Sequence, residues 1–401
     1  MRDAPEKKRS AVALLLTLCL LGVFPIDVLL PSFPALSAHF VTSPADIALS
    51  ISLFAVGIAL SQLLIGPLSD VIGRKGLLLG GIATAMIGAV GCAVATDYTA
   101  FLCLRFVQAL GCGCFVLSQA LVQDLFEGQE RDRLRILMVT ATGIFISVSP
   151  LAGAVLQSLL DWPGSFLVFA ALAAVVLVKT SLLLDGARPV TTDSRPKLFR
   201  AYQRVCSDVD FVSYWLISAL AFTCHFSFIV ISPLIFMEQL QLSTYDFSVI
   251  LLYYGVAYIA GGIVAAVLSR RLTAGQQIVI GLCLILASGL VMLHLATHAP
   301  LSVATVLIPM VICTAGTTIA RPAATSGAMC LFPDNAGTSA SAGSILIFIC
   351  GGLISAVISV SPTDLPSTLG YAFILLSGLS LALNSQIHRR ARRLKRPENV
   401  E

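Results

Sequence analysis

Two ionisable side chains stand inside stretches of sequence that are otherwise apolar. Asp27 lies near the end of the run 11–33, and Arg105 lies near the start of the run 99–123. A charge at the centre of a membrane helix costs roughly 2.5–3.5 kcal/mol on insertion scales, so each residue needs a reason. By helical rise the two residues lie at similar depth and can pair across the interior. The pair would be either a structural ion pair or one whose carboxylate exchanges a proton.

Further polar and aromatic residues in the apolar runs are candidates for a solute site. His225 is a candidate for proton handling together with Asp27 and Arg105, and a satisfied packing histidine is the alternative interpretation. Aromatic rings suit a cavity that tolerates varied solutes, although apolar packing also predicts them there. The predicted cavity residues are Asp27, Gln108, Phe115, Phe226, Ser232 and Tyr254.

The composition places these residues in a membrane protein. Of 401 residues, 57% are hydrophobic and 11% charged, and the mean hydropathy is +0.93, whereas soluble domains carry roughly 25% charged residues. The net charge of +4 is not distributed as a nucleic-acid footprint would be. The eleven cysteines fall mostly inside apolar runs, so we expect neither a disulfide framework nor a metal site.

Twelve apolar stretches are long enough to cross a hydrocarbon core as helices. With both termini placed inside, every Lys and Arg except Arg105 falls on the cytoplasmic side, as the positive-inside rule requires. The first run passes any signal-peptide length without a convincing cleavage site, so we interpret it as a retained helix. The twelve predicted spans are 11–33, 46–68, 77–96, 99–123, 134–158, 165–184, 211–236, 246–268, 276–296, 301–321, 337–360 and 367–387.

A polar segment with two prolines divides the chain into two sets of six spans. The prediction is an N-terminal six-helix bundle at 1–184, a cytoplasmic linker at 185–210, a C-terminal six-helix bundle at 211–388 and a basic tail at 389–401. Parallel halves with a solute site between them near the midplane form a known transporter arrangement.

The loop 66–76 carries spaced glycines, an aspartate and two basic residues. Its pattern G-x-L-S-D-x-x-G-R-K resembles the signature loop between the second and third helices of the major facilitator superfamily. The resemblance implies a cytoplasmic latch that holds the two halves together and so shifts conformational populations. The predicted gate residues are Gly66, Asp70, Gly73, Arg74 and Asp124.

Three further stretches resemble motifs of drug:proton antiporters. They are the helix 1 motif that contains Asp27, the helix 4 motif that contains Arg105 and Gln108, and the helix 5 motif that contains Gly143, Pro150 and Gly153. In the helix 5 motif Ser149 and Ala152 replace two glycines, which weakens the argument for export over uptake. The stretches 226–233 and 332–342 are similar to those of the Bcr/CflA group of drug-resistance exporters.

The resemblance implies an all-helical major facilitator fold and a proton-coupled secondary transporter that exports amphipathic or cationic drugs by alternating access. Export of a self-made metabolite such as a siderophore or antibiotic, and proton-coupled uptake, remain alternatives; a receptor of transporter shape is a third. The sequence has no Walker loop and no Ser/His or metal constellation, so we expect no enzyme and no cofactor, with the proton gradient as driver. The expected partners are a small-molecule substrate, protons and lipid, for a monomer in the bacterial inner membrane.

Overall fold

The structure, a computed structural model, describes residues 3–184, 202–332, 336–361 and 364–394. Every regular element in these residues is helical. The predicted linker falls mostly on 185–201, outside the described residues, and 202–207 are helical. The predicted basic tail is described as far as residue 394.

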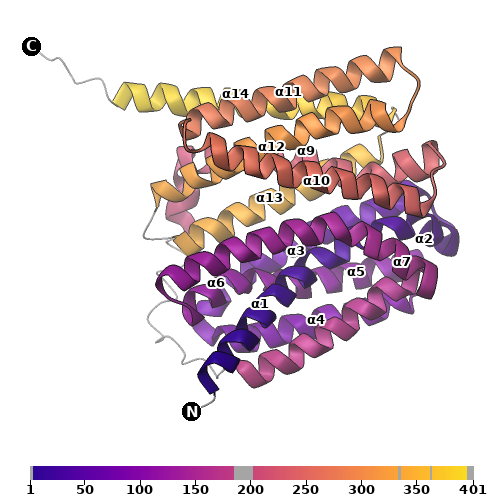
Figure 1. The fold of residues 1–401 in the computed structure, drawn as a ribbon, viewed down its shortest axis with the longest axis vertical. Coiled ribbons are helices and arrows are strands. Elements are labelled where there is room, and N and C mark those ends of the chain that lie inside the picture. Colours follow the sequence, from indigo (N-terminus) through magenta and orange to yellow (C-terminus); the bar gives the residue numbers. More distant parts are fainter. Residues whose placement is uncertain (1–2, 185–201, 333–335, 362–363, 395–401) are drawn as a thin grey trace, which may run out of the picture.

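The helices before residue 184 lie together, drawn in indigo to magenta in the lower part of Figure 1. Since α1 packs along α7 and α4 packs between α5 and α7, they form one bundle. These elements are α1 (Asp3–Asp27), the 3-10 turn η1 (Leu30–Ser32), α2 (Phe33–Phe40), α3 (Pro44–Ile72), α4 (Arg74–Ala93), α5 (Tyr98–Cys112), the 3-10 turn η2 (Gly113–Val116), α6 (Leu117–Leu125) and α7 (Gly128–Leu183).

The later helices form the upper part of Figure 1, in red to yellow. The start of α1 and the end of α14 lie at the same end of the molecule, here called the terminal end, and the opposite end is called the far end (Figure 1). The elements are α9 (Val209–Pro233), the π-helical turn η4 (Leu234–Gln239), α10 (Thr244–Leu268), α11 (Ala274–His298), α12 (Val303–Leu331), α13 (Ala336–Ser359) and α14 (Leu365–Leu394).

Eleven helical segments among the described residues are long and apolar enough to span a membrane. One of them belongs to α7, whose 56 residues would extend about 84 Å if straight, far more than one hydrocarbon core of about 30 Å. Inside α7 the backbone leaves the helical region at Asp161, with φ 58° and ψ −175°, and the chain reverses there. Two passes joined at Asp161 bring the total to twelve, so the predicted all-helical membrane fold is confirmed.

Side-chain caps set several of the helix starts. Ser43 and Asp46 form a reciprocal capping box at the start of α3, and Thr273 with Gln276 does the same for α11. Such caps supply acceptors and donors for backbone groups that have no partner inside the helix. Asp97 caps α5 in the simpler way, by accepting from the amide of Ala100.

Several predicted helix ends differ from the structure, and two of them bear on the polar residues of the interior. The first span ends at Asp27 rather than at residue 33, and η1 and α2 then follow as separate short elements. The tenth span does not stop at residue 321: α12 runs through Pro322 and ends at Leu331. Arg321 therefore lies within a membrane-length helix, and Arg105 is not the single arginine in such a position.

The two sets of helices meet along α3 against α13 and along α7 against α10. The hydroxyls of Ser52 and Ser355 lie 2.8 Å apart, and the Ser344 hydroxyl donates to Gln62 Oε1 at 2.6 Å. Each of these contacts is one hydrogen bond between uncharged groups, so each contributes little free energy to the interface. The interface can therefore exchange contacts without leaving a buried charge unpaired.

Candidate functional site

Arg105 is fully buried in α5, and its guanidinium has partners on α5 itself, on α1 and on α3. Nη1 donates to Gln108 Oε1 at 2.8 Å, and Nη2 donates to the backbone carbonyl of Pro25 at 3.2 Å. The charge also lies 4.2 Å from the ring centroid of Phe54. Buried cations need such hydrogen bonds and ring contacts to offset lost hydration.

The Pro25 carbonyl accepts from Arg105 because α1 ends at Asp27. Carbonyls in the last turn of a helix have no intrahelical donor, and a basic side chain commonly satisfies them. Arg105 therefore caps the end of α1, where the negative end of the helix dipole also favours a cation.

Asp27 is the last residue of α1 and only 8% exposed. Within the described part of the chain, no ion pair joins it to Arg105, and no other side chain donates a hydrogen bond to it. The predicted Asp27–Arg105 ion pair is therefore wrong for this conformation. The guanidinium instead bonds the carbonyl two residues before the carboxylate.

The helix 5 motif lies against this end of α1. Gly153 of α7 packs on the backbone of Val28, and a Cβ at position 153 would collide with the Val28 carbonyl. Pro150, in the preceding turn, is buried, whereas a Cβ at Gly143 would meet only Ile259 of α10, at 4.0 Å. The absence of a side chain at Gly153 thus fixes how closely α7 approaches the residue after Asp27.

A small cavity of about 10 Å³ lies beside Gln108 and Pro25, closed by Phe24 and Phe166. A space of about 10–15 Å³ is what one water molecule needs. Gln108 lines the cavity, and its Nε2 has no hydrogen-bond partner among the described residues. The cavity is therefore about the size of one water molecule and is lined by a residue with an unpaired donor.

In the second half, His225, Tyr254 and Thr314 form a hydrogen-bonded chain across α9, α10 and α12. The Thr314 hydroxyl donates to the Tyr254 oxygen at 2.6 Å, and that oxygen lies 2.5 Å from His225 Nδ1. Tyr254 accepts from the Thr314 hydroxyl, and its own hydroxyl hydrogen can then be donated to Nδ1. For a neutral imidazole this pattern places the ring proton on Nε2.

The other predicted cavity residues come from both halves, and their common cavity stays a prediction. Phe115 is buried in η2, and Phe226 stacks on Phe222 with ring centroids 5.3 Å apart. The Ser232 hydroxyl donates to the Ile229 carbonyl of its own helix. Asp27, Gln108 and Phe115 belong to the first half, whereas Phe226, Ser232 and Tyr254 belong to the second.

The predicted gate is described only in part. Gly73 forms the one-residue turn between α3 and α4 with φ 87°, a conformation that favours glycine, and Arg74 begins α4. The neighbouring Lys75 donates to the Ser181 carbonyl near the end of α7 at 2.9 Å. The side chains of Asp70 and Asp124, and the surroundings of Gly66, lie outside the described residues, so the latch stays a prediction.

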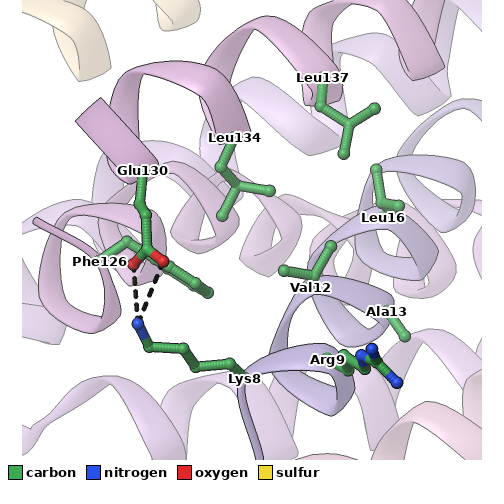
Figure 2. A pocket seen from close by; sticks show the side chains of 9 residues that line it. All are labelled: Lys8, Arg9, Val12, Ala13, Leu16, Phe126, Glu130, Leu134 and Leu137. Carbon is green, nitrogen blue, oxygen red and sulfur yellow. Dashed lines mark hydrogen bonds and ion pairs between the residues drawn. The ribbon is translucent and has the colours of Figure 1, made fainter. Parts of the chain in front are cut away.

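A larger pocket of about 460 Å³ opens at the terminal end, between α1 and the start of α7 (Figure 2). Figure 2 shows apolar walls that include Val12, Leu16 and Leu134, with Lys8 and Glu130 at the mouth. Lys8 Nζ lies 2.8 Å from a Glu130 carboxylate oxygen. Both walls belong to the first half, so the pocket is separate from the interface between the halves.

All eleven cysteines are free thiols. In the described ranges, no group of three His, Cys, Asp or Glu residues is arranged to hold a metal ion.

Three groups of the polar interior were not predicted from the sequence. The Pro25 carbonyl has no side-chain signature and becomes available only because α1 ends where it does. Thr314 lies in an apolar run without any nearby charge, and Arg321 was assigned to a loop. An arginine followed by proline within an apolar run was the available signal for the last of these.

Comparison with curated proteins finds bacterial transporters. The chain is 27% identical over 271 residues to an uncharacterized MFS-type transporter, YdgK, of Bacillus subtilis, covering 66% of this chain and 67% of that protein. It is 29% identical over 282 residues to the multidrug transporter MdfA of Shigella boydii, covering 67% and 68%. The match to the multidrug resistance protein MdtL of Escherichia fergusonii is 27% over 227 residues, 56% of this chain and only 58% of that protein.

Two solved transporter structures share the fold of this chain, and a family model matches most of its length. The D-xylose–proton symporter superposes with a TM-score of 0.71 at 14% identity, covering 92% of this chain and 96% of that one. A bacterial homologue of the lysosomal transporter Spinster, inward-facing and unoccupied, gives 0.69 at 15%, covering 96% and 95%. The Major Facilitator Superfamily model matches residues 14–358. This protein, a membrane transporter rather than an enzyme, therefore belongs to the major facilitator superfamily of secondary transporters.

Proposed function

We propose that the protein exports small amphipathic molecules, including drugs, in exchange for protons, with Asp27 as the residue that carries the proton. The observation that supports this most directly is a buried carboxylate without a partner, two residues from a carbonyl that holds the buried Arg105. Relatives named as a multidrug transporter and a multidrug resistance protein support the export of drugs.

The proposed switch uses two acceptors for one guanidinium. When Asp27 is protonated, Arg105 donates to the Pro25 carbonyl, as in this structure. When Asp27 is ionised, its carboxylate is the stronger acceptor, because a charge-assisted hydrogen bond is roughly twice as strong as a neutral one. The end of α1 must then move relative to α5.

That movement reaches the rest of the molecule through Gly153. Because α7 packs directly on the Val28 backbone, a displacement of the end of α1 displaces α7 as well. The same helix packs against α10 of the other half. Proton exchange at Asp27 thereby biases the contact between the halves, which is what alternating access requires.

In this scheme two bundles, 1–184 and 211–388, rock about the interface, and the loop 66–76 with Asp124 latches the terminal end. His225 serves as a second proton-handling residue through Tyr254. The protein works as a monomer in the bacterial inner membrane with both termini in the cytoplasm. Asymmetry of Lys and Arg along the chain supports that orientation.

The test is drug flux in proteoliposomes with an imposed pH gradient. We expect the wild type to accumulate a fluorescent amphipathic drug only when the gradient is present. Asp27→Asn should abolish this dependence, and Asp27→Glu should retain part of it. Glu238→Gln, which removes a carboxylate at the far end of the second half, is the matched control and should behave as wild type. Flux that ignores the gradient, or full coupling in Asp27→Asn, would refute the proposal.

A further inference from the structure

Arg321 lies well inside α12 and not in a loop. It is ten residues before Leu331 and eighteen after Val303, so the helical rise places its Cα about 15 Å from the terminal end of α12 and about 27 Å from the other end. A charge at this depth requires compensation.

The side chain points toward the interior of the second half. Arg321 shares a helical face with Thr314 and Thr317, whose hydroxyls donate to Tyr254 of α10 and to the Ala221 carbonyl of α9. The guanidinium carbon lies 4.7 Å from the ring centroid of Phe222 in α9. Phe222 is thirteen residues into α9, about 20 Å from its start. The side chain therefore reaches away from the nearer membrane surface, the opposite of snorkelling.

Rings from two helices form a surface beneath this charge. Phe222 stacks on Phe226 with an interplanar angle of 22°, and it meets Phe348 of α13 edge to face at 6.0 Å. Arg321, Phe222 and Phe348 are each partly accessible. An aromatic ring and the Arg321 guanidinium are therefore both accessible at the same place.

No protein group neutralises Arg321 in the part of the chain that the structure describes. It has no ion pair and no hydrogen bond there, and the nearby acidic residues of the second half stand at helix ends, as Asp210, Glu238 and Asp246 do. Asp210 already lies 3.5 Å from Arg390. Arg105, by contrast, donates to two protein acceptors.

From this we infer that Arg321, with the partly accessible rings of Phe222 and Phe348, binds the anionic group and the adjoining aromatic ring of the transported molecule. The inference rests on the proposed function and narrows its substrate class to aromatic carboxylates and similar anions. A guanidinium offers two parallel N–H donors to a carboxylate, and a ring contact holds the apolar part. A bound anion would supply the countercharge that the protein itself does not.

The test is binding of a matched pair of probes, 2-naphthoate and the uncharged 2-naphthamide, to the full-length protein in nanodiscs of neutral lipid, measured by calorimetry without a proton gradient. We expect the wild type to bind naphthoate at least about tenfold more tightly, a difference of about 1.4 kcal/mol. Arg321→Gln should abolish this preference and Arg321→Lys should retain part of it. Arg271→Gln, at an exposed site beyond the end of α10, should leave it unchanged.

Equal affinity for the two probes in the wild type, no binding of either, or a preference that survives in Arg321→Gln would overturn the inference. Arg321→Gln must elute as a monodisperse protein, and Arg321→Lys provides a second reading if it does not. The outcome is separable from that of the transport proposal. Gradient-driven flux of the aromatic cation ethidium without any naphthoate preference refutes only the anion site, whereas naphthoate preference without gradient-driven flux of any drug refutes only the transport scheme.

Discussion

The polar interiors of the two halves are built differently. In the first half Arg105 bonds the Pro25 carbonyl at the end of α1, and the Asp27 carboxylate two residues on is the competing acceptor in our proposal. In the second half His225, Tyr254 and Thr314 form a neutral chain in which each hydroxyl has a defined role. A charged group with alternative acceptors can switch, whereas a hydrogen-bonded chain whose members are satisfied favours one arrangement of its helices. The comparison predicts that the main proton switch lies in the first half, with His225 of the second half in a lesser role.

The largest effect should come from removing the buried guanidinium of Arg105. Arg105→Leu leaves the Pro25 carbonyl and the Gln108 amide without their donor, and each buried unpaired group costs about 1–3 kcal/mol. We expect a loss of about 3 kcal/mol in unfolding free energy, measured by denaturant titration in one detergent. Arg270→Leu, at an exposed position, is the control. Equal stability of both variants would mean that Arg105 does not cap α1.

A second test concerns the contact between α7 and the end of α1. Gly153→Ala forces a Cβ into the Val28 carbonyl, and overpacking of this kind costs about 1–3 kcal/mol. We therefore expect reduced drug flux and a lower melting temperature. Gly262→Ala, where a Cβ meets nothing within 4 Å, should have neither effect. Gly143→Ala should be milder than Gly153→Ala, and a reversed order would remove Gly153 from the mechanism.

The hydrogen-bonded chain of His225, Tyr254 and Thr314 can be tested by removing one oxygen atom. Tyr254→Phe removes the hydroxyl that joins His225 to Thr314, at a cost of about 1–2 kcal/mol. We expect lower thermal stability, with gradient-driven flux reduced but still coupled. Tyr253→Phe is the matched control, because Tyr253 is 66% exposed. Complete loss of coupling in Tyr254→Phe would show that the second half switches as well.

The smallest effect should come from the mouth of the pocket in Figure 2. Lys8 and Glu130 are both more than half exposed, and exposed pairs contribute about 0–1 kcal/mol. A double-mutant cycle with Lys8→Ala and Glu130→Ala should give a coupling energy below about 0.5 kcal/mol and flux close to wild type. A larger coupling would make this pair part of the terminal latch.

Hydropathy and the distribution of Lys and Arg were enough to predict the fold, because span length and loop charge are local properties of the sequence. The partner of Arg105 was not predictable in the same way, since a backbone carbonyl becomes an acceptor only where its helix ends. The predicted tenth span stopped at residue 321, just before Pro322, but a membrane helix tolerates proline when neighbouring helices support it. Arg321 was therefore assigned to a loop instead of to the interior of the second half.

The reversal at Asp161 has a mechanical consequence. The fifth and sixth passes join there without slack, with the Asp161 carboxylate accepting from both Gln157 Nε2 and the Trp162 amide. The fifth pass contacts the opposite half. A tilt of this pass is therefore transmitted to the sixth pass through the corner at Asp161. The other ends of both passes lie at the terminal end, so a given tilt about Asp161 moves them farthest from their present contacts with Lys8 and Lys75.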